Sequence, residues 1–312
     1  MRTLFAAGVC AASLALTPMP AEAGPLNLRH VGADAQFVVH IDMEAMRESE
    51  AGRSLLGIIT QVADDAFDDI EDELGIDPRS NIDDATIYGA SDDEGDLVII
   101  VHGNGELADA LDRARKEIED IDSDRARGVE YEMWDAGDET LYVFEASRRG
   151  ETTVVIAFDE DRLVDAVRVL AGEDDGLRGD AADAFGEPLR NAFLFVSVAG
   201  DMGLDEFGQA SDMLRLTDRV IVQVGGDESL DMSLDLTADS HDDAKNLMGL
   251  LQGAVAVARI AASQQDFGTR EERDALLALA DGMQFESDGR RVRISASFDP
   301  DWLAEMIEEH AD

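Results

Sequence analysis

Apolar positions along the chain alternate between two spacings, one typical of strands and one typical of helices. The run Ala35–Ile41 has the composition of a strand, and the residues after it keep helical spacing through Leu74. That spacing predicts a long helix over 44–74, with Gly75 just beyond its end. Two β-rich runs, 85–90 and 97–102, flank a short polar segment and predict a hairpin.

The rest of the chain also shows strand spacing and helix spacing in turn. The first half is completed by a helix over 105–121, strands near 129–134, 140–145 and 152–158, and a helix starting at Asp159, a favourable capping residue. The second half predicts a strand over 192–198, a hairpin of 219–225 and 230–237, helices over 240–262 and 270–281, strands over 283–286 and 291–298, and a last helix capped by Asp299.

The two halves repeat the same order of elements. Residues 83–110 align without a gap on 217–244, with identities at Asp84/Asp218, Ile87/Ile221, Asp93/Asp227, Glu94/Glu228, Asp109/Asp243 and Ala110/Ala244. A second match places Phe158-Asp159 on Phe298-Asp299. The shared order predicts an α+β fold, a duplicated unit of antiparallel sheet packed with amphipathic helices.

The predicted domains follow from this repeat. Residues 171–190 are rich in Gly, Asp and Ala and have the composition of a linker. We expect unit 1 over 24–180 and unit 2 over 181–312. Whether the two units form separate sheets or share one merged sheet stays open from the sequence.

The N-terminus has the pattern of a signal peptide. Arg2 precedes the uncharged apolar run Leu4–Leu16, and Ala21-Glu22-Ala23 supplies a small-x-small cleavage site. About 13 apolar residues are too few to span a bilayer, which takes roughly 20. We therefore expect cleavage of 1–23, export to the periplasm or the extracellular space, and no membrane insertion after signal removal.

Cleavage would also remove Cys10, the one cysteine in the chain. Val9 precedes it where a lipoprotein site needs a small residue, so we do not expect a lipid anchor. The mature chain would then have no disulfide, no thiolate nucleophile and no cysteine metal ligand.

The charge balance excludes some partners. The chain has 25 Lys+Arg against 70 Asp+Glu, a formal net charge of −45. Nucleic acid and anionic lipid surfaces need a basic footprint, which is missing here. The acids are dispersed over nearly every turn and helix, which favours adaptation to a salty medium over a dedicated surface for cations or basic partners. A protein or envelope partner remains possible.

The opening of the expected mature chain resembles a known group. Gly32-Ala33-Asp34, Phe37-Val38-Val39 and Ile41-Asp42 are similar to the first strand of a broad set of exported bacterial proteins without assigned activity. The resemblance implies a signal peptide and repeated α+β units. It implies no activity, cofactor or site residue.

His40 and Asp42 are the most suggestive chemical pair. Two residues apart on a strand, they leave the same face, as a catalytic dyad or metal pair would. The alternative is a strand whose core face carries Phe37, Val39 and Ile41, while Asp42 caps the next helix. A single pair without a third ligand is not a site, so the second alternative is favoured.

Other motifs fail on their details. The remaining histidines are scattered along the sequence, and no nucleophile elbow, dinucleotide fingerprint or P-loop occurs. Asp120-x-Asp122-x-Asp124 imitates a calcium loop but has Arg125 where Gly is required. Trp302 lies on the apolar stripe of the last predicted helix, as a core residue would.

The sequence therefore predicts no catalytic, cofactor-binding or metal-binding residue, and no cofactor. Two classes of function remain. One is a non-catalytic exported module that binds a partner or acts in the envelope. The other is a carboxylate-based or cation-dependent hydrolase with a site near His40. A deep cleft holding His40 with carboxylates would favour the hydrolase, and a filled core would favour the module.

Overall fold

The computed structural model describes residues 24–60, 67, 76–91, 93–118, 120–135, 140–186, 188–189, 191–199, 216–263 and 270–300. The predicted signal peptide 1–23 with Cys10, most of the second half of the predicted helix 44–74, and the last predicted helix with Trp302 lie outside the described residues, except for the Asp299 cap and Pro300.

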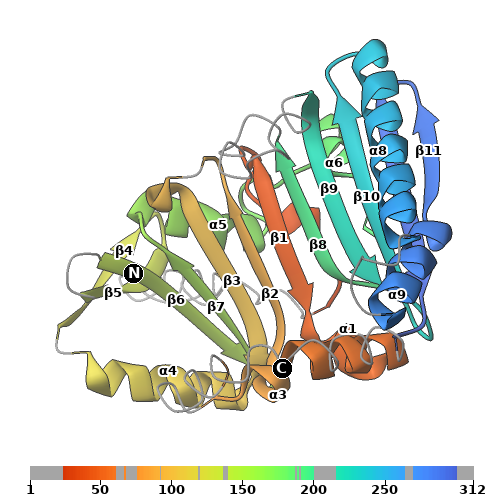
Figure 1. Ribbon diagram of the computed structural model, residues 1–312. Coiled ribbons are helices and arrows are strands. Elements are labelled where there is room, and N and C mark those ends of the chain that lie inside the picture. The colour runs from red at the N-terminus through yellow and green to blue at the C-terminus, as the bar shows by residue number, and fades with distance from the viewer. Residues whose placement is uncertain are drawn as a thin grey trace, which may run out of the picture.

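Helices and a large antiparallel sheet make the fold a mixed α+β fold (Figure 1). All pairs of neighbouring strands in the sheet are antiparallel, and the described strands run in the order β11-β12-β10-β9-β8-β1-β2-β3-β7-β6-β5-β4. Their bounds are β1 Phe37–Asp42, β2 Ile82–Gly89, β3 Leu97–Asn104, β4 Ile121–Ala126, β5 Val129–Asp135, β6 Thr140–Arg148, β7 Glu151–Ala157, β8 Ala192–Ala199, β9 Thr217–Gly225, β10 Leu230–Ala238, β11 Gln284–Asp288 and β12 Arg291–Phe298.

The two halves of the chain meet at the centre of this sheet. β1 pairs with β8 in a register that places Val39 opposite Val196 and Ile41 opposite Leu194. Strands of the first half extend from β1 to one edge, and strands of the second half extend from β8 to the other. The described strands therefore form the merged sheet, while the division at residue 180 stays a prediction.

Helices cover both faces and one end of the sheet (Figure 1). α1, α3 and α4 lie along one end of the strands, α8 and α9 lie over β10 to β12, and α5 and α6 lie behind the sheet. Their bounds are α1 Met43–Glu48, α3 Pro78–Asn81, α4 Gly105–Glu117, α5 Glu160–Leu170, α6 Asp180–Phe185, α8 His241–Ala262 and α9 Arg270–Gly282, and the short 3-10 helices are η1 Leu28–His30 and η2 Glu94–Asp96.

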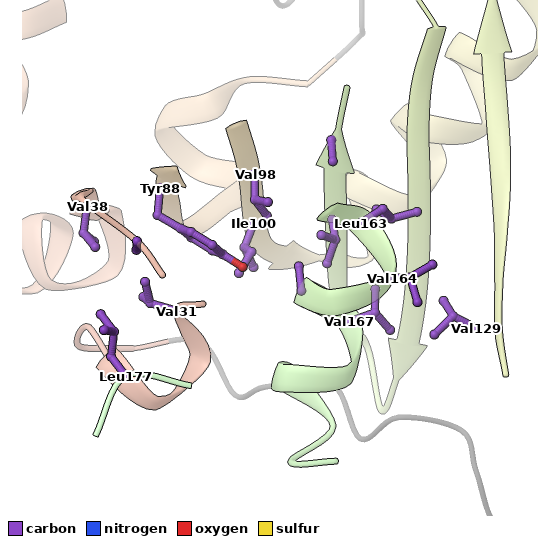
Figure 2. Packing of buried hydrophobic residues seen from close by; sticks show 14 of the residues in the cluster. Val31, Val38, Tyr88, Val98, Ile100, Val129, Leu163, Val164, Val167 and Leu177 are labelled. Carbon is purple, nitrogen blue, oxygen red and sulfur yellow. The ribbon is translucent and has the colours of Figure 1, made fainter. Parts of the chain in front are cut away.

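The largest core lies between the sheet and α5. Val38, Tyr88 and Val98 stand opposite one another on β1, β2 and β3, so their side chains share a face. Figure 2 shows Leu163, Val164 and Val167 on α5 packed toward this face. The Asp159 side chain accepts from the Arg162 backbone nitrogen, which confirms the cap predicted from the sequence at the start of α5.

The opposite face of the sheet is covered by α4 and α8. Leu236 on β10 lies in the same row of paired residues as Phe37 on β1, with β9 and β8 between them. Phe37 is next to Val38 in β1, so the side chains of this row point to the face opposite α5. Leu236 and Val292 pack with Leu247 of α8. At the other end of this face, Leu107 and Leu111 of α4 pack with a cluster that includes Trp134.

The long helix predicted over 44–74 is interrupted. α1 ends at Glu48, Ser49 has extended backbone, and residues 50–60 are helical again. The Ser49 hydroxyl accepts from the Gly52 backbone nitrogen at 2.9 Å, as a helix cap does. A Cβ on Gly52 would approach the Met46 carbonyl oxygen to 2.4 Å, so the corner requires glycine. Apolar spacing continues across such a corner, which is why the sequence did not reveal it.

The stretch 171–190, whose composition is that of a linker, packs onto the core. Leu177 is 1% exposed, and its backbone nitrogen donates to the Val31 carbonyl oxygen at 2.9 Å. Phe185 on α6 is also buried, and Gly176 forms a bridge with Gly32. This stretch therefore joins the first residues of the expected mature chain to the main core.

Strand β4 was not predicted. It carries the Asp122 and Asp124 carboxylates of the failed calcium motif on exposed positions at the edge of the sheet. β11, at the other edge, is similarly polar, with Glu286 and Asp288 exposed. Charged edges discourage pairing with another chain.

Candidate functional site

Buried polar residues form one row across four neighbouring strands, on the same face as the main core. Asp42, Asp84 and His102 stand opposite one another on β1, β2 and β3, and Thr153 on β7 follows. His40 and Thr86 are opposite each other in the next row. With His30 on η1, these residues define the polar cluster: His30, His40, Asp42, Asp84, Thr86 and His102.

Hydrogen bonds tie the polar cluster together. The His102 Nδ1 atom lies 2.7 Å from the Asp84 Oδ1 atom, and the His40 Nδ1 atom lies 2.8 Å from the Thr86 Oγ1 atom. The Gly24 backbone nitrogen donates to the Asp84 Oδ2 atom at 2.9 Å. Asp84 is 2% exposed, His40 3% and His102 7%, so these bonds form away from solvent, where hydrogen bonding to a charged group is strongest.

The first residues of the described chain cover the polar cluster. A cavity of about 30 Å³ lies inside it, lined by His40, Asp84 and His102 on one side and by the segment 24–31 and Leu170 on the other. This volume is about that of a single water molecule. Among the described residues, the His40 and His102 Nε2 atoms are buried without a hydrogen-bond partner, so the polar groups that border this cavity are suited to one water.

Burial shapes the protonation of the cluster. Desolvation lowers the pKa of His40, partly opposed by the Asp84 carboxylate. Desolvation also lowers the pKa of His30, and His102 adds to that effect. Both rings are therefore neutral at pH 7. Burial raises the pKa of Asp42, partly opposed by the hydrogen bond from the Ala45 backbone nitrogen.

One part of the second alternative for His40 and Asp42, the helix cap, is present in the structure. The Asp42 carboxylate accepts from the Ala45 backbone nitrogen at 2.7 Å and caps α1, as one alternative expected. The expected faces of the strand are reversed, however, because His40 and Asp42 lie on the buried side while Ile41 is exposed. The core of α5 sits on the histidine side, which strand composition alone could not show.

The histidines that are scattered in sequence are partly gathered in space. His30, His40 and His102 surround Asp84, whereas His241 is exposed on α8 and His310 lies outside the described residues. Sequence reasoning missed Asp84 and His102 because they meet only through the register of β2 and β3. A signal existed at His102, which directly follows the apolar run Leu97–Val101, whereas Asp84 follows another acid and gave none.

Within the described part of the chain, no group of three or more His, Cys, Asp or Glu side chains is placed to hold a metal ion. Likewise, none of the helices that the structure describes is long and apolar enough to cross a membrane.

Larger hollows lie on the surface, two of them over strands at opposite ends of the sheet. The first, about 780 Å³, runs along β10 and β12. Its lining combines apolar side chains with acidic and hydroxyl ones: Leu189, Met232 and Ala296, and Asp227, Glu228, Asp231, Glu286, Ser295 and Ser297. Its one lining arginine, Arg293, pairs with the buried Asp235, with Nε to Oδ1 at 2.8 Å. Within the described lining, the excess charge is therefore negative.

The second hollow, about 570 Å³, lies over β4 to β6 around Arg115. The Arg115 guanidinium bonds Glu132 and Glu145, each at 2.8 Å, so its charge is already matched. Trp134 is buried and donates from Nε1 to Glu132, so it offers no open aromatic platform for a sugar ring.

Comparisons with known proteins add no function. No family model matches the chain, and no curated protein matches it. Two crystal forms of TP0453 have similar structures: form III at a TM-score of 0.49 and 9% identity, covering 92% of this chain and 99% of that chain, and form I at 0.45 and 10%, covering 93% and 99%.

Proposed function

We propose that the protein is an exported acidic module that acts by binding a partner or in envelope structure, without catalysis. The observation that carries this proposal is the closed polar cluster. His40, Asp84 and His102 border a cavity of about 30 Å³, whereas small-molecule sites are typically about 300–1,000 Å³. The residues with catalytic chemistry therefore border a small space under the N-terminal segment, with little room for a substrate.

The groups of the cluster are also engaged in structural roles. Asp42 caps α1, and the two oxygens of Asp84 bond His102 and Gly24. A carboxylate-based or cation-dependent hydrolase near His40 would need these contacts to break and the N-terminal segment to leave. This alternative gains no support from the geometry.

The hollow along β10 and β12 is the surface that best fits a binding role. It is wide, concave and negatively charged, and polar residues of a turn line one end of it. Such a surface favours a basic or hydroxyl-rich partner over an anionic one. A protein segment or envelope component with that chemistry is the partner class that we infer.

We infer that the fold is a duplicated unit whose two copies, 24–180 and 181–312, share one sheet. Strand order supports this. Outward from the β1–β8 pair, one direction reads β1, β2, β3, β7, β6 and the other reads β8, β9, β10, β12, β11. A helix follows the first hairpin in each half, α4 after β3 and α8 after β10. β4 and β5 extend the first copy beyond β6.

The binding proposal can be tested by charge reversal in the hollow. The native protein and variants are cross-linked in the exported fraction and purified. We expect a cross-linked partner with the unchanged protein and with Glu94→Lys, a control exposed on η2, and its loss with Asp231→Lys in the hollow. Hydrolysis of peptide, ester or glycoside substrates by the purified protein, abolished in His40→Gln, would overturn the non-catalytic assignment.

A further inference from the structure

Gly24 occupies a special place, because its backbone nitrogen contacts a buried carboxylate. The Asp84 Oδ2 atom accepts from this nitrogen at 2.9 Å, while the Oδ1 atom bonds His102 at 2.7 Å. An ionised carboxylate in the core is costly unless it is paired. The Gly24 nitrogen is thus one of two polar contacts that hold Asp84 in its buried position.

The proposed signal cleavage changes the chemistry of that nitrogen. Hydrolysis of the Ala23–Gly24 peptide bond by an exported-side protease consumes one water, leaving a carboxylate on Ala23 and an amine on Gly24. The ordinary pKa of an α-amine is about 7.7–8.0, so at pH 7 this amine takes up a proton. A neutral amide donor thereby becomes an ammonium in contact with a buried carboxylate.

We propose that Asp84 is the binding site for the α-ammonium of Gly24, and that signal cleavage locks the N-terminal segment (residues 24–31) over the polar cluster. This inference rests on the proposed processing after Ala23. Charge-assisted hydrogen bonds are roughly twice as strong as neutral ones, so the processed chain holds the segment more tightly than the precursor does.

The N-terminal segment is already guided to this position. Val31 is fully buried, and Leu26 and Leu28 pack against the main core. The Val31 carbonyl oxygen accepts from the Leu177 backbone nitrogen, and Gly32 bridges Gly176. These contacts bring Gly24 to Asp84 and already order most of the N-terminal segment. The ion pair then adds stability to a segment that is largely in place.

The charges around the contact favour a cation. Asp84 on β2 is next to Asp42 on β1, and the pKa values of His30 on η1 and His40 on β1 are lowered mainly by burial. Those two rings are neutral at pH 7 and do not repel an ammonium. His102 on β3 faces the other oxygen of Asp84.

The test compares two forms of the mature chain that differ only at the amine. All described elements lie within residues 24–300, so the chain 24–312 carries the whole described fold. One form has a free Gly24 amine, released by a site-specific protease in vitro, and the other is Nα-acetylated. We expect the free amine to melt about 3–6 °C higher at pH 7, as a charge-assisted bond of this kind would give in a chain of this size.

The pH dependence identifies the cause. Pairing with Asp84 raises the pKa of the folded amine above its unfolded value, so the advantage is complete below about pH 8 and is lost as pH rises through the folded pKa. We expect the two forms to converge by about pH 10. In the Asp84→Asn variant, the pKa of the Gly24 amine should lie in the ordinary range. The rate of acylation of this amine, followed against pH, measures that pKa.

Asp83→Asn is the matched control. Asp83 is the neighbour of Asp84 on β2 but pairs with Arg47, so this variant keeps the contact between the amine and Asp84 and should retain the full difference from its acetylated form. Equal melting of free and acetylated chains from pH 7 to 10 would overturn the inference. Because both forms are made in vitro, this outcome is distinguishable from failure of the export proposal, which N-terminal sequencing of exported protein decides.

Discussion

His102 on β3 bonds Asp84 on β2 through its Nδ1 atom, 2.7 Å from the carboxylate Oδ1 atom, inside the core of a protein whose other acids are mostly on the surface. The pair forms because the two residues stand opposite each other in the β2–β3 ladder. Asp84 therefore contributes to the interior of the fold.

Replacing Asp84 should therefore destabilise the fold. Asp84→Asn removes the charge that His102 and Gly24 contact, and breaking such a buried pair costs about 3–5 kcal/mol. Asp83→Asn is the control, because Asp83 neighbours it on β2 but pairs with Arg47 in a half-exposed position worth about 1 kcal/mol or less. Chemical denaturation measures both, and equal losses would contradict the structural role of Asp84.

Because of the histidines of the polar cluster, we expect the folded protein to lose stability in mild acid. Burial lowers the folded pKa of His40 below its unfolded value of about 6.5, so the unfolded chain binds more protons there. The contribution of His40 is present above pH 6.5 and is lost as pH falls through the folded pKa. His40→Gln should flatten the fall in melting temperature between pH 7 and pH 5.

The control for this titration is His241→Gln on the exposed start of α8, which should leave the pH profile unchanged. A profile that stays as steep in His40→Gln as in the unchanged protein would show that other groups cause the acid sensitivity.

The seam between the two proposed units should behave as core. Leu177→Ala removes a buried side chain and should cost about 2–5 kcal/mol in the free energy of unfolding. Leu189→Ala is its match in the same stretch, 39% exposed, and should cost well under half as much. If Leu177→Ala unfolds at the same denaturant concentration as the unchanged protein, the stretch is a linker after all.

Salt should stabilise the protein through screening. At a net charge of −45, carboxylates repel one another across the fold, with a screening length of about 30 Å at 0.01 M salt and about 3 Å at 1 M. We expect the melting temperature to rise with NaCl over this range. A flat response would contradict the screening explanation, whereas a melting temperature that a chelator lowers at constant ionic strength would indicate a specific cation site.

Local signals in the sequence predicted most elements but not their partners. The caps at Asp42 and Asp159 follow from short-range preferences, and so do the hairpins of 85–90 with 97–102 and of 219–225 with 230–237. The structure contains all four, with hairpin strands that are slightly longer than predicted. β4 was missed because a run with three charged residues hardly alternates in hydrophobicity, although pairing with β5 makes it a strand.

The candidate site depends on contacts between distant residues, which explains why it escaped prediction. Asp84 and His102 are 18 residues apart, and Asp84 and Gly24 are 60 apart. Only strand register brings the first pair together, and only the docking of the segment 24–31 brings the second. A polar residue inside an apolar strand is the sequence signal for such a cluster, but it does not name the partner.

We expect the protein to be exported and processed so that its mature chain starts at Gly24, whose nitrogen contacts Asp84. Intact-mass and N-terminal sequence analysis of the protein recovered from the exported fraction tests this. We expect a single chain that begins Gly24-Pro25-Leu26. A chain that retains Met1, or one cut at another residue, would contradict it.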